Sequence, residues 1–433
     1  MAEIHPFRGV HYNQRTVKDL AALICPPYDV ISPQLQQELY QRDEHNFVRL
    51  EHNRELPQDT TTDNKYTRSA AILERWLQQG VLVADKAPAL YLHDHHFHRG
   101  GREYRRRGIL AGVRLQEWAD NVVRPHEGTL SEHTDDRLSL LWVCQANTSP
   151  VLALFEDSGP IASLLSQKEK TPPTLSSSEV DGERHDLWII DEPAALKSIC
   201  DSLSAQPLYI ADGHHRYESA LSYRRERNAC SSSVTGEEAF NFVMMELVAF
   251  DDPGLVILPA HRLVRGMSKA ALSELAERLN SFFDVEAQPI GKTDVWGQID
   301  GLLSGGDSGE VKLVLLGLVE GKLLQLKLRD FSAADQMMPH FHSELYKRLD
   351  VDIVDNVIPH KPGESAESVI NYSYDGQDAV SRVLQQEYQL AFLLSPVRAE
   401  AVKAIADAGD KMSRKATYFY PKAPAGLVLH RLD

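Results

Sequence analysis

The residues best suited to chemistry in this chain lie in one stretch, PLYIADGHHRYESALSYRRER, at positions 207–227. A short apolar run ends at Asp212 and Gly213, and two histidines and Arg216 follow directly. The run PLYIA predicts a buried strand, and the sequence after it predicts a helix. The chemical groups are therefore expected where a strand passes into the start of a helix.

A helix start of this kind is suited to binding an anion. Its first amides and the positive end of its dipole point outward, and Gly213 allows a phosphate to approach the backbone closely. Arg216 offers a planar fork for phosphate oxygens, while His214 and His215 add donors or a base near neutral pH. Asp212 is better suited to bind Mg²⁺ or to orient a histidine. The corner, defined here as Asp212 to Arg216, therefore predicts a phosphate site with Asp212 as metal ligand.

The same residues also have a purely structural interpretation. Asp212 can cap the helix, Gly213 can make the turn, and the histidines can be exposed to solvent. An Asp, two His and an Arg within five consecutive positions favour the phosphate site over that interpretation.

A second candidate block, RPHEGTLSEHTDDRLSLL, covers residues 124–141. A carboxylate beside an imidazole can act as general base or metal ligand, so Glu127, with His126 beside it, is expected to take a proton from a substrate hydroxyl. Arg137 is a further candidate to contact a nucleotide. The structural alternative is a helix capped by Thr134 with acids in its first turn, and it leaves His126 and Glu127 unexplained.

The histidine-rich segment HDHHFH, residues 93–98, has the composition of a metal site. On a strand, His93 and His95 face one way and His96 and His98 face the other, so at most two of them can share an ion. No partner at helical or CxxC spacing is near. The sequence therefore favours a solvated hairpin face here.

Three further segments could border the phosphate site. The prolines of CPPYDVIS fix the loop that carries Tyr28 and Asp29, as the rim of a binding site requires. Lys415 and Lys422 flank an aromatic strand and could reach a phosphate, although lysines beside a terminal strand more often protect a sheet edge. The arginines of GREYRRRG, residues 101–108, are expected on the exposed face of a hairpin.

The elements that position these groups follow from local patterns. Ser32 before a proline predicts a helix start, and Gly80 predicts the end of the helix that begins near residue 64. Gly100 and its glycine neighbour predict the turn of a hairpin over residues 88–115.

Mixed strand and helix order without strict βαβ alternation predicts an α+β or mixed α/β fold. Residues 1–250 are expected to form an α/β region with the candidate nucleotide site. Residues 251–433 are expected to form an α+β region packed closely on the first.

Composition limits the partners and the compartment. Lys and Arg number 46 against 62 Asp and Glu, a net charge of −16 that repels nucleic acid, so a nucleic-acid partner is not expected. The first twenty residues contain no signal-peptide core, and no stretch approaches the roughly twenty apolar residues that span a bilayer. The four scattered cysteines fit a reducing cytosol. A cytoplasmic protein without a membrane partner is expected, with its oligomeric state open.

Blocks spread over nearly the whole chain resemble a known family. The segments ADGHHRYESA, CPPYDVIS, RPHEGTL with DDRLSLL, DPGLVILPAHRLV and KATYFYPKAPAGLV are similar to those of the bacterial and archaeal domain-of-unknown-function family 1015. That family carries no firmly assigned function. The chain departs from the expected Thr, Pro and Ser at Ala260, Ser413 and Ala416.

The DGHHR block also resembles the second box of the ParB and sulfiredoxin superfamily, which includes a free-serine kinase. In those relatives the corresponding corner lies at a helix start and holds nucleotide phosphates. The resemblance implies a ParB/sulfiredoxin-like nucleotide-binding core, with a C-terminal α+β region beside it.

Three functions are compatible with these residues. The favoured one is a nucleotide-dependent phosphotransferase acting on a small hydroxyl-bearing metabolite such as free serine, with ATP or ADP and Mg²⁺ at the corner and Glu127, His126 and His215 as candidate catalytic groups. The second is a nucleotide-binding regulator without turnover. The third is a metal-dependent hydrolase that uses Asp212 with His214 and His215, whose ligand set is incomplete at recognisable spacing.

Overall fold

The chain forms two compact units. The computed structural model describes residues 1–433 except 18, 158–159, 205, 231–234, 292, 305–310, 330–331, 333–337, 339–341 and 359–369. The first unit comprises Met1–Pro125, Thr129–Val256 and Pro421–Asp433, and the second comprises His126–Gly128 and Ile257–Tyr420.

A nine-stranded mixed sheet forms the centre of the first unit. Eight strands follow the order β6-β11-β8-β12-β5-β4-β10-β9, and β1 pairs with β5. The pairs β11 with β6 and β12 with β8 are parallel, and the others are antiparallel. The strands are β1 (Ile4–His5), β4 (Leu90–Arg99), β5 (Arg102–Arg114), β6 (Val123–Arg124), β8 (Val151–Phe155), β9 (Leu175–Ser176), β10 (Glu183–Ile190), β11 (Leu208–Asp212) and β12 (Phe242–Ala249).

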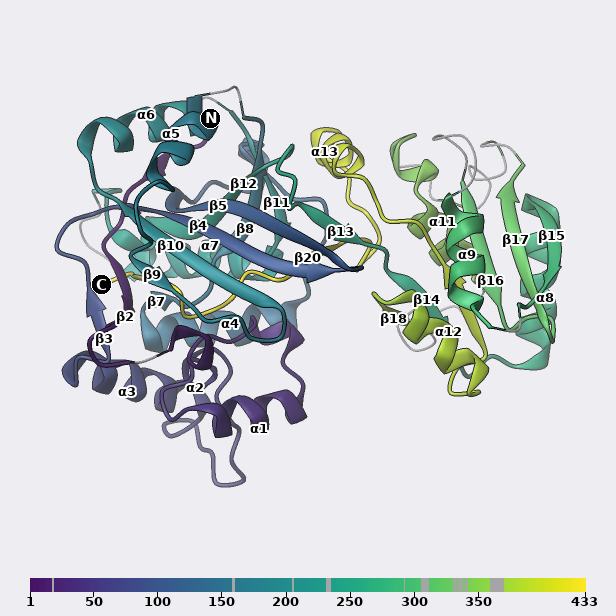
Figure 1. The fold of residues 1–433 in the computed structure, drawn as a ribbon, viewed down its shortest axis with the longest axis horizontal. Helices are drawn as coiled ribbons and strands as arrows, with labels where there is room; N and C mark the ends of the chain where they lie inside the picture. Colours follow the sequence, from purple (N-terminus) through teal and green to yellow (C-terminus); the bar gives the residue numbers. More distant parts are fainter. Residues whose placement is uncertain are drawn as a thin grey trace. The chain divides into compact units, whose positions relative to one another are not determined.

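Helices cover both faces of this sheet. Figure 1 shows α5 and α6 on one side and α1, α2 and α3 on the other. Apolar residues of α5, α6 and α7 share one buried core with the sheet, and those of α1, α2 and α3 share a second core with its opposite face. The helices are α1 (Pro33–Arg42), α2 (Val48–Glu51), α3 (Lys65–Gln78), α4 (Ser131–Cys144), α5 (Pro160–Lys168), α6 (Pro193–Leu203) and α7 (His214–Cys230).

A smaller antiparallel sheet in the first unit has the order β3-β2-β21-β7. It joins the two ends of the chain, because β2 lies near the N-terminus and β21 near the C-terminus. Its strands are β2 (Gly9–Tyr12), β3 (Leu82–Ala84), β7 (Ala146–Asn147) and β21 (Leu429–Arg431).

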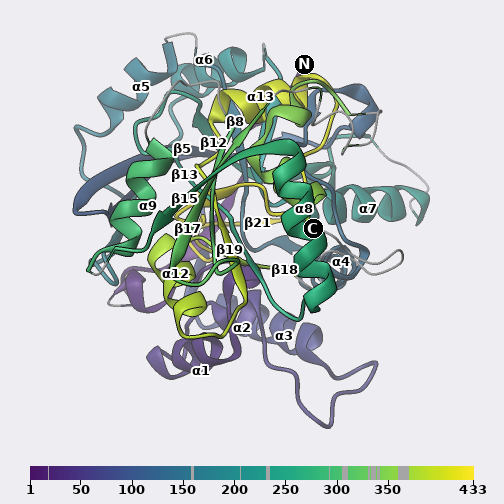
Figure 2. The ribbon, with the colours of Figure 1, turned by 90° about the vertical axis from the view of Figure 1, so that its right-hand side faces the viewer.

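The second unit is built on a six-stranded antiparallel sheet of order β15-β17-β16-β19-β14-β18. Helices α9 and α12 share a core with this sheet, and Figure 2 shows α8 on its other side. The strands are β14 (His261–Val264), β15 (Phe283–Pro289), β16 (Lys312–Leu316), β17 (Lys322–Leu328), β18 (Ile370–Ser373) and β19 (Leu390–Leu393), with the separate pair β13 (Val256–Leu258) and β20 (Tyr418–Tyr420). The helices are α8 (Lys269–Phe282), α9 (Val295–Ser304), α11 (Asp350–Val357), α12 (Gly376–Leu384) and α13 (Ala399–Asp407).

Several predicted boundaries are confirmed. Ser32 caps α1 by accepting a hydrogen bond from the Leu35 amide at 3.1 Å. Gly80 follows α3 with a φ of +69°, and Gly100 turns the β4–β5 hairpin with a φ of +58°. The predicted mixed α/β character is confirmed as well, because the large sheet contains both parallel and antiparallel pairs.

The structural alternative in which Thr134 caps a helix is wrong. Helix α4 begins at Ser131, three residues before Thr134, after the extended residue Leu130. Thr134 lies inside the helix, where its hydroxyl donates to the Leu130 carbonyl at 3.0 Å.

All four cysteines are unpaired, and two of them, Cys25 and Cys144, are buried, as expected for residues that pack. In the part of the chain that the structure describes, no helix has both the length and the apolar character needed to cross a bilayer.

Candidate functional site

The predicted corner is formed as expected, with β11 ending at Asp212 and α7 beginning at His214. A shift of register in β11 decides where Asp212 points. Ile210 pairs with Ala153 of β8, whereas Asp212 pairs with the next residue, Leu152, so the chain bulges at the residue between them. Because neighbouring residues of β8 face opposite sides, the bulge places Asp212 on the other face of the sheet from Ile210.

Asp212 lies between two cations. Arg216 donates through Nη2 to Oδ2 of Asp212 at 2.6 Å, and Lys422 forms a short hydrogen bond with Oδ1. Lys422 also lies 3.9 Å from Asp29, so the loop predicted as a rim does lie beside the corner. Burial alone would raise the pKa of Asp212, but Lys422 and Arg216 outweigh it and hold the pKa well below its ordinary value. Asp212 is therefore a permanent anion at neutral pH.

Arg216 is 8% exposed and makes several contacts at the corner. Besides its bond to Asp212, it donates through Nη1 to the carbonyl of Pro150 in a short hydrogen bond. Its Nε makes no hydrogen bond to any residue that the structure describes. The two terminal nitrogens of the Arg216 guanidinium are thus bonded to Pro150 and Asp212, and Nε is a buried donor without a hydrogen bond among the described residues.

Gly213 is required at the turn for two reasons. Its φ is +90°, in the left-handed region that favours glycine. A Cβ at this position would lie 2.9 Å from Nε of Arg216, so a side chain would crowd the guanidinium. The turn therefore brings the Gly213 backbone directly against Arg216.

His214 and His215 open α7 and differ in environment. His214 is buried. His215 is half-buried, and its Nε2 accepts a hydrogen bond from the Leu130 amide at 2.9 Å. Burial, together with the neighbouring His133, lowers the pKa of His215 to about 4. A neutral His215 thus holds the segment before α4 against the start of α7.

Arg137 lies in a second buried network of the first unit. Its Nη1 donates to the Glu51 carbonyl at 3.0 Å, its Nε donates to Asp136 at 2.9 Å, and its guanidinium lies 4.0 Å above the centre of the Tyr28 ring. Arg137 and Arg216 both line a cavity of about 30 Å³. That volume admits about a water molecule and is far below the roughly 300 Å³ of small-molecule pockets.

A larger cavity of about 440 Å³ lies elsewhere in the first unit. Its lining includes His5, Phe7, Arg8, Phe242 and His430, and none of the residues predicted from the sequence as site residues. Its volume suits a small ligand, but none of the residues from Asp212 to Arg216 lines it.

His126 and Glu127 belong to the second unit. His126 is buried, and its Nε2 lies 2.9 Å from the hydroxyl oxygen of Thr417. The Thr417 hydroxyl donates a hydrogen bond to Oε1 of Glu127 at 3.4 Å. His126 and Glu127 are 3.8 Å apart, and the Glu127 side chain is 19% exposed. The expected carboxylate and imidazole pair therefore exists, with a threonine hydroxyl beside it.

The interpretation of residues 93–98 as a solvated face is wrong for His93 and His95, which are fully buried. The predicted alternation does hold, because His98 on the other face is exposed. The sequence reasoning missed the partners on β10. His185 pairs directly with His95, and Glu183 is two residues away on the same face.

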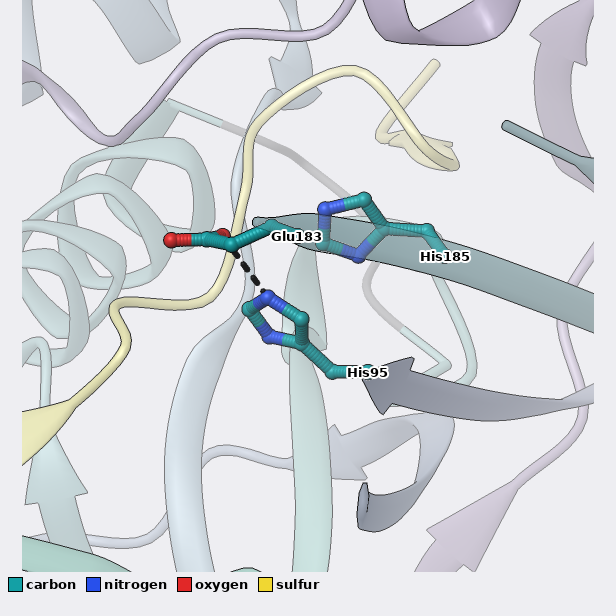
Figure 3. Close-up of side chains that lie close together, drawn as sticks. All are labelled: His95, Glu183 and His185. Atoms are coloured by element: carbon teal, nitrogen blue, oxygen red, sulfur yellow. Dashed lines mark hydrogen bonds and ion pairs between the residues drawn. The ribbon is translucent and has the colours of Figure 1, made fainter. Parts of the chain in front are cut away.

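Figure 3 shows His95, Glu183 and His185 gathered between β4 and β10. Each offers one ligand atom, and these atoms all lie within 4.8 Å of one another. Among the described residues this is the group with metal-binding geometry, rather than Asp212 with His214 and His215. Burial lowers the pKa of both His95 and His185 well below the ordinary value and raises the pKa of Glu183 to about 7.

The corner and the histidines occupy one face of the same sheet. Leu152 pairs with Asp212 on one side and with Glu246 of β12 on the other. Glu246 accepts a hydrogen bond from Nδ1 of His93 at 2.7 Å, and Nε2 of His93 lies 3.1 Å from Nδ1 of His185. A polar band thus crosses the sheet of the first unit from β11 to β10.

The model of a family described as "Protein of unknown function (DUF1015)" matches residues 4–352. No curated protein matches the chain. A conserved hypothetical protein from Pyrococcus furiosus is 13% identical over 75% of this chain and 95% of its own, with a TM-score of 0.36.

Two other solved structures are similarly distant. A free serine kinase in complex with AMP is 14% identical over 74% of this chain and 91% of its own, with a TM-score of 0.34. The protein SbnI from Staphylococcus aureus, with a C-terminal truncation, is 9% identical over 74% of this chain and 87% of its own, also with a TM-score of 0.34. Superpositions this poor carry no argument about the activity of this chain.

Proposed function

The chain belongs to the DUF1015 family, and we propose that it is a nucleotide-dependent phosphotransferase that acts on a small hydroxyl-bearing metabolite, with free serine as the first candidate. The observation that carries the proposal is the ionised Asp212, held between Arg216 and Lys422 at a glycine corner before a long helix.

This arrangement offers cations for the phosphate groups of a nucleotide and a carboxylate for the metal ion that accompanies them. Asp212 balances the charges of Arg216 and Lys422, which are cations of the two kinds that pair with phosphate oxygens. Asp212 is an oxygen donor of the type that Mg²⁺ takes together with phosphates, and the ion would neutralise charge on the transferring phosphoryl group. The Gly213 backbone and the positive end of the α7 dipole attract the same anion.

We keep Glu127 as the candidate general base that the sequence indicates. In the proposed reaction the acceptor hydroxyl attacks the terminal phosphoryl group, the bond to the leaving nucleotide phosphate breaks, and the base takes the hydroxyl proton. His126 and Thr417 hold the Glu127 carboxylate through the contacts described above. His215 serves as a positioning residue, because its Nε2 already accepts the Leu130 amide.

Arg137 supports the rim of the proposed site. It stacks over Tyr28, the residue before Asp29, and Asp29 lies near Lys422. The proposed nucleotide binds on the partly exposed side of the corner, at Gly213 and His215, because the cavity beside Arg137 is too small for it.

The alternative is a nucleotide-binding regulator without turnover, which would use the same corner but not Glu127. The test incubates purified protein with ATP or ADP, Mg²⁺ and a panel of hydroxy amino acids, and it measures nucleotide consumption. We expect consumption that depends on one acceptor and falls at least 100-fold in Glu127→Gln, the size of a typical acid–base contribution. Binding without consumption for any acceptor would reject the kinase in favour of the regulator.

A further inference from the structure

The buried histidines on β4 and β10 carry a second site, separate from the proposed reaction. His95 and His185 are directly paired across the two strands, and their ring centres are 4.2 Å apart. Glu183 Oε2 lies 2.8 Å from Nε2 of His95 (Figure 3). We propose that His95, His185 and Glu183 bind a divalent first-row transition metal ion, with Zn²⁺ as the probe.

The donor set decides the class of ion. Two imidazole nitrogens and one carboxylate oxygen suit Zn²⁺, Fe²⁺ and similar ions, whereas Mg²⁺ and Ca²⁺ prefer oxygen donors alone. The two histidines are almost completely buried, but the Glu183 side chain is 34% exposed. Solvent therefore reaches the group from the Glu183 side, where a water molecule can complete the coordination of three protein ligands.

The orientation of His185 is fixed by two further residues. The carboxylate of Glu246 accepts a hydrogen bond from Nδ1 of His93. With its one ring proton on Nδ1, His93 accepts at Nε2, and the proton in the 3.1 Å contact between the two rings then lies on Nδ1 of His185. This leaves the lone pair of His185 on Nε2, and a carboxylate–histidine chain of this kind typically orients a metal-binding imidazole.

Gly108 of β5 makes the Glu246 contact possible. A Cβ at position 108 would lie 2.6 Å from Cγ of Glu246, so only glycine leaves room for that side chain to cross toward His93. The carboxylate is completely buried, and its ordinary cost of burial is offset by His93 and by Arg106. The buried Glu246 carboxylate thus orients the His93 ring.

Arg106 determines which ring nitrogen of His95 carries the proton before an ion binds. Its Nη2 donates to Nδ1 of His95 at 3.3 Å, so the ring proton lies on Nε2, facing Glu183. Coordination through Nε2 moves that proton to Nδ1, and the long Arg106 contact is then given up. The carbonyl of Pro421 keeps its 2.7 Å hydrogen bond with Nη1 of Arg106.

The experiment measures Zn²⁺ binding to the full chain after chelator treatment, by competition with a chromophoric chelator, and Co²⁺ absorption as a report on coordination. We expect each chain to bind one Zn²⁺ ion tightly. Glu183→Gln should weaken Zn²⁺ at least tenfold and change the Co²⁺ spectrum; this variant changes a partly exposed side chain and should fold. Glu246→Gln, which changes a residue that contacts His93 and none of the three proposed ligands, should weaken Zn²⁺ by about 10–100-fold.

His98→Gln is the matched control, because His98 lies on the same strand but is exposed on the opposite face. It should bind Zn²⁺ as the native chain does. The proposal is overturned if the native chain binds no tight ion, if Glu183→Gln binds as tightly as native, or if His98→Gln weakens binding as much as Glu183→Gln.

Discussion

At the scale of single residues, the central feature is a buried carboxylate whose charge is balanced from two distant parts of the sequence. Arg216 is four residues from Asp212, but Lys422 is 210 residues away. Removing one partner of such a buried pair typically costs about 3–5 kcal/mol, because the other charge is left without compensation. The corner therefore depends on the C-terminal segment as well as on the DGHHR stretch.

The first prediction concerns Gly213. Gly213→Ala should lower the free energy of unfolding by about 1–2 kcal/mol for its left-handed backbone and by a further ~1–3 kcal/mol for crowding Arg216. Gly100→Ala is the control, because its φ is also positive but no atom lies within 4 Å of the added Cβ. Denaturant unfolding should show the larger loss for Gly213→Ala; equal losses would mean that the crowding has no consequence.

The second prediction concerns the pH dependence from His215. Its folded pKa of about 4 lies below its ordinary value of 6.5, so the unfolded chain binds more protons between these values. The contribution of His215 to stability is therefore complete above pH 6.5 and is lost as the pH falls toward 4. His215→Gln removes this titration, so the native-minus-variant difference in unfolding free energy should rise with pH across that window. Parallel curves would contradict the prediction.

The residues of the proposed phosphate site could be identified from the sequence because they are consecutive. Lys422 was predicted either to reach a phosphate or to protect a sheet edge, and its contact with Asp212 was not predicted, since nothing in its neighbourhood indicates that contact. Glu183 and His185 were missed entirely. Their signal was present, because they are two residues apart and so share a strand face, but the pairing of β10 with β4 is not visible in one sequence.

At the scale of elements, irregularities in the large sheet position the polar groups. Regular alternation along β11 would place Asp212 on the same face as Leu208 and Ile210, which lie in the core shared with α5, α6 and α7. The bulge before Asp212 places it on the face of Glu246 instead. Hydrophobic patterning predicts the strand and not the bulge, which explains why the shared face was unexpected.

The third prediction tests how β5 and β12 fit together. Gly108→Ala should lower the free energy of unfolding by about 1–3 kcal/mol, because its Cβ would displace Glu246 from the space beside His93. Gly112→Ala on the same strand is the control, since the nearest atom to its Cβ would be the His5 carbonyl oxygen, at the milder distance of 3.3 Å. Calorimetric or denaturant unfolding compares the two; a smaller loss for Gly108→Ala than for Gly112→Ala would show that Glu246 can move aside freely.

At the scale of the whole molecule, the charge of −16 limits what the cationic corner can attract. A nucleotide needs only the few donors gathered at the corner, whereas a nucleic acid must approach the wider negative surface. The mixed α/β class followed from the order of predicted helices and strands. The strand order of the large sheet did not, because it depends on pairings such as β12 with both β5 and β8 that join distant segments.

The fourth prediction follows from this charge. At about 50 mM salt, where phosphate contacts are strongest, the native chain should not retain double-stranded DNA in a filter-binding or mobility assay. The same preparation should bind ADP with Mg²⁺. Retention of DNA that falls steeply as salt is raised would contradict the prediction and would favour a nucleic-acid partner.

The most direct test of the account is calorimetric titration of the full chain with ADP and Mg²⁺, comparing native protein with Asp212→Asn. Circular dichroism first establishes that the variant is folded. We predict saturable binding to the native chain and at least a tenfold weaker affinity in Asp212→Asn, which corresponds to about 1.4 kcal/mol. Equal affinity of the two proteins, or no heat of binding with ADP, ATP or any other nucleotide, would show that the corner is not a nucleotide phosphate site.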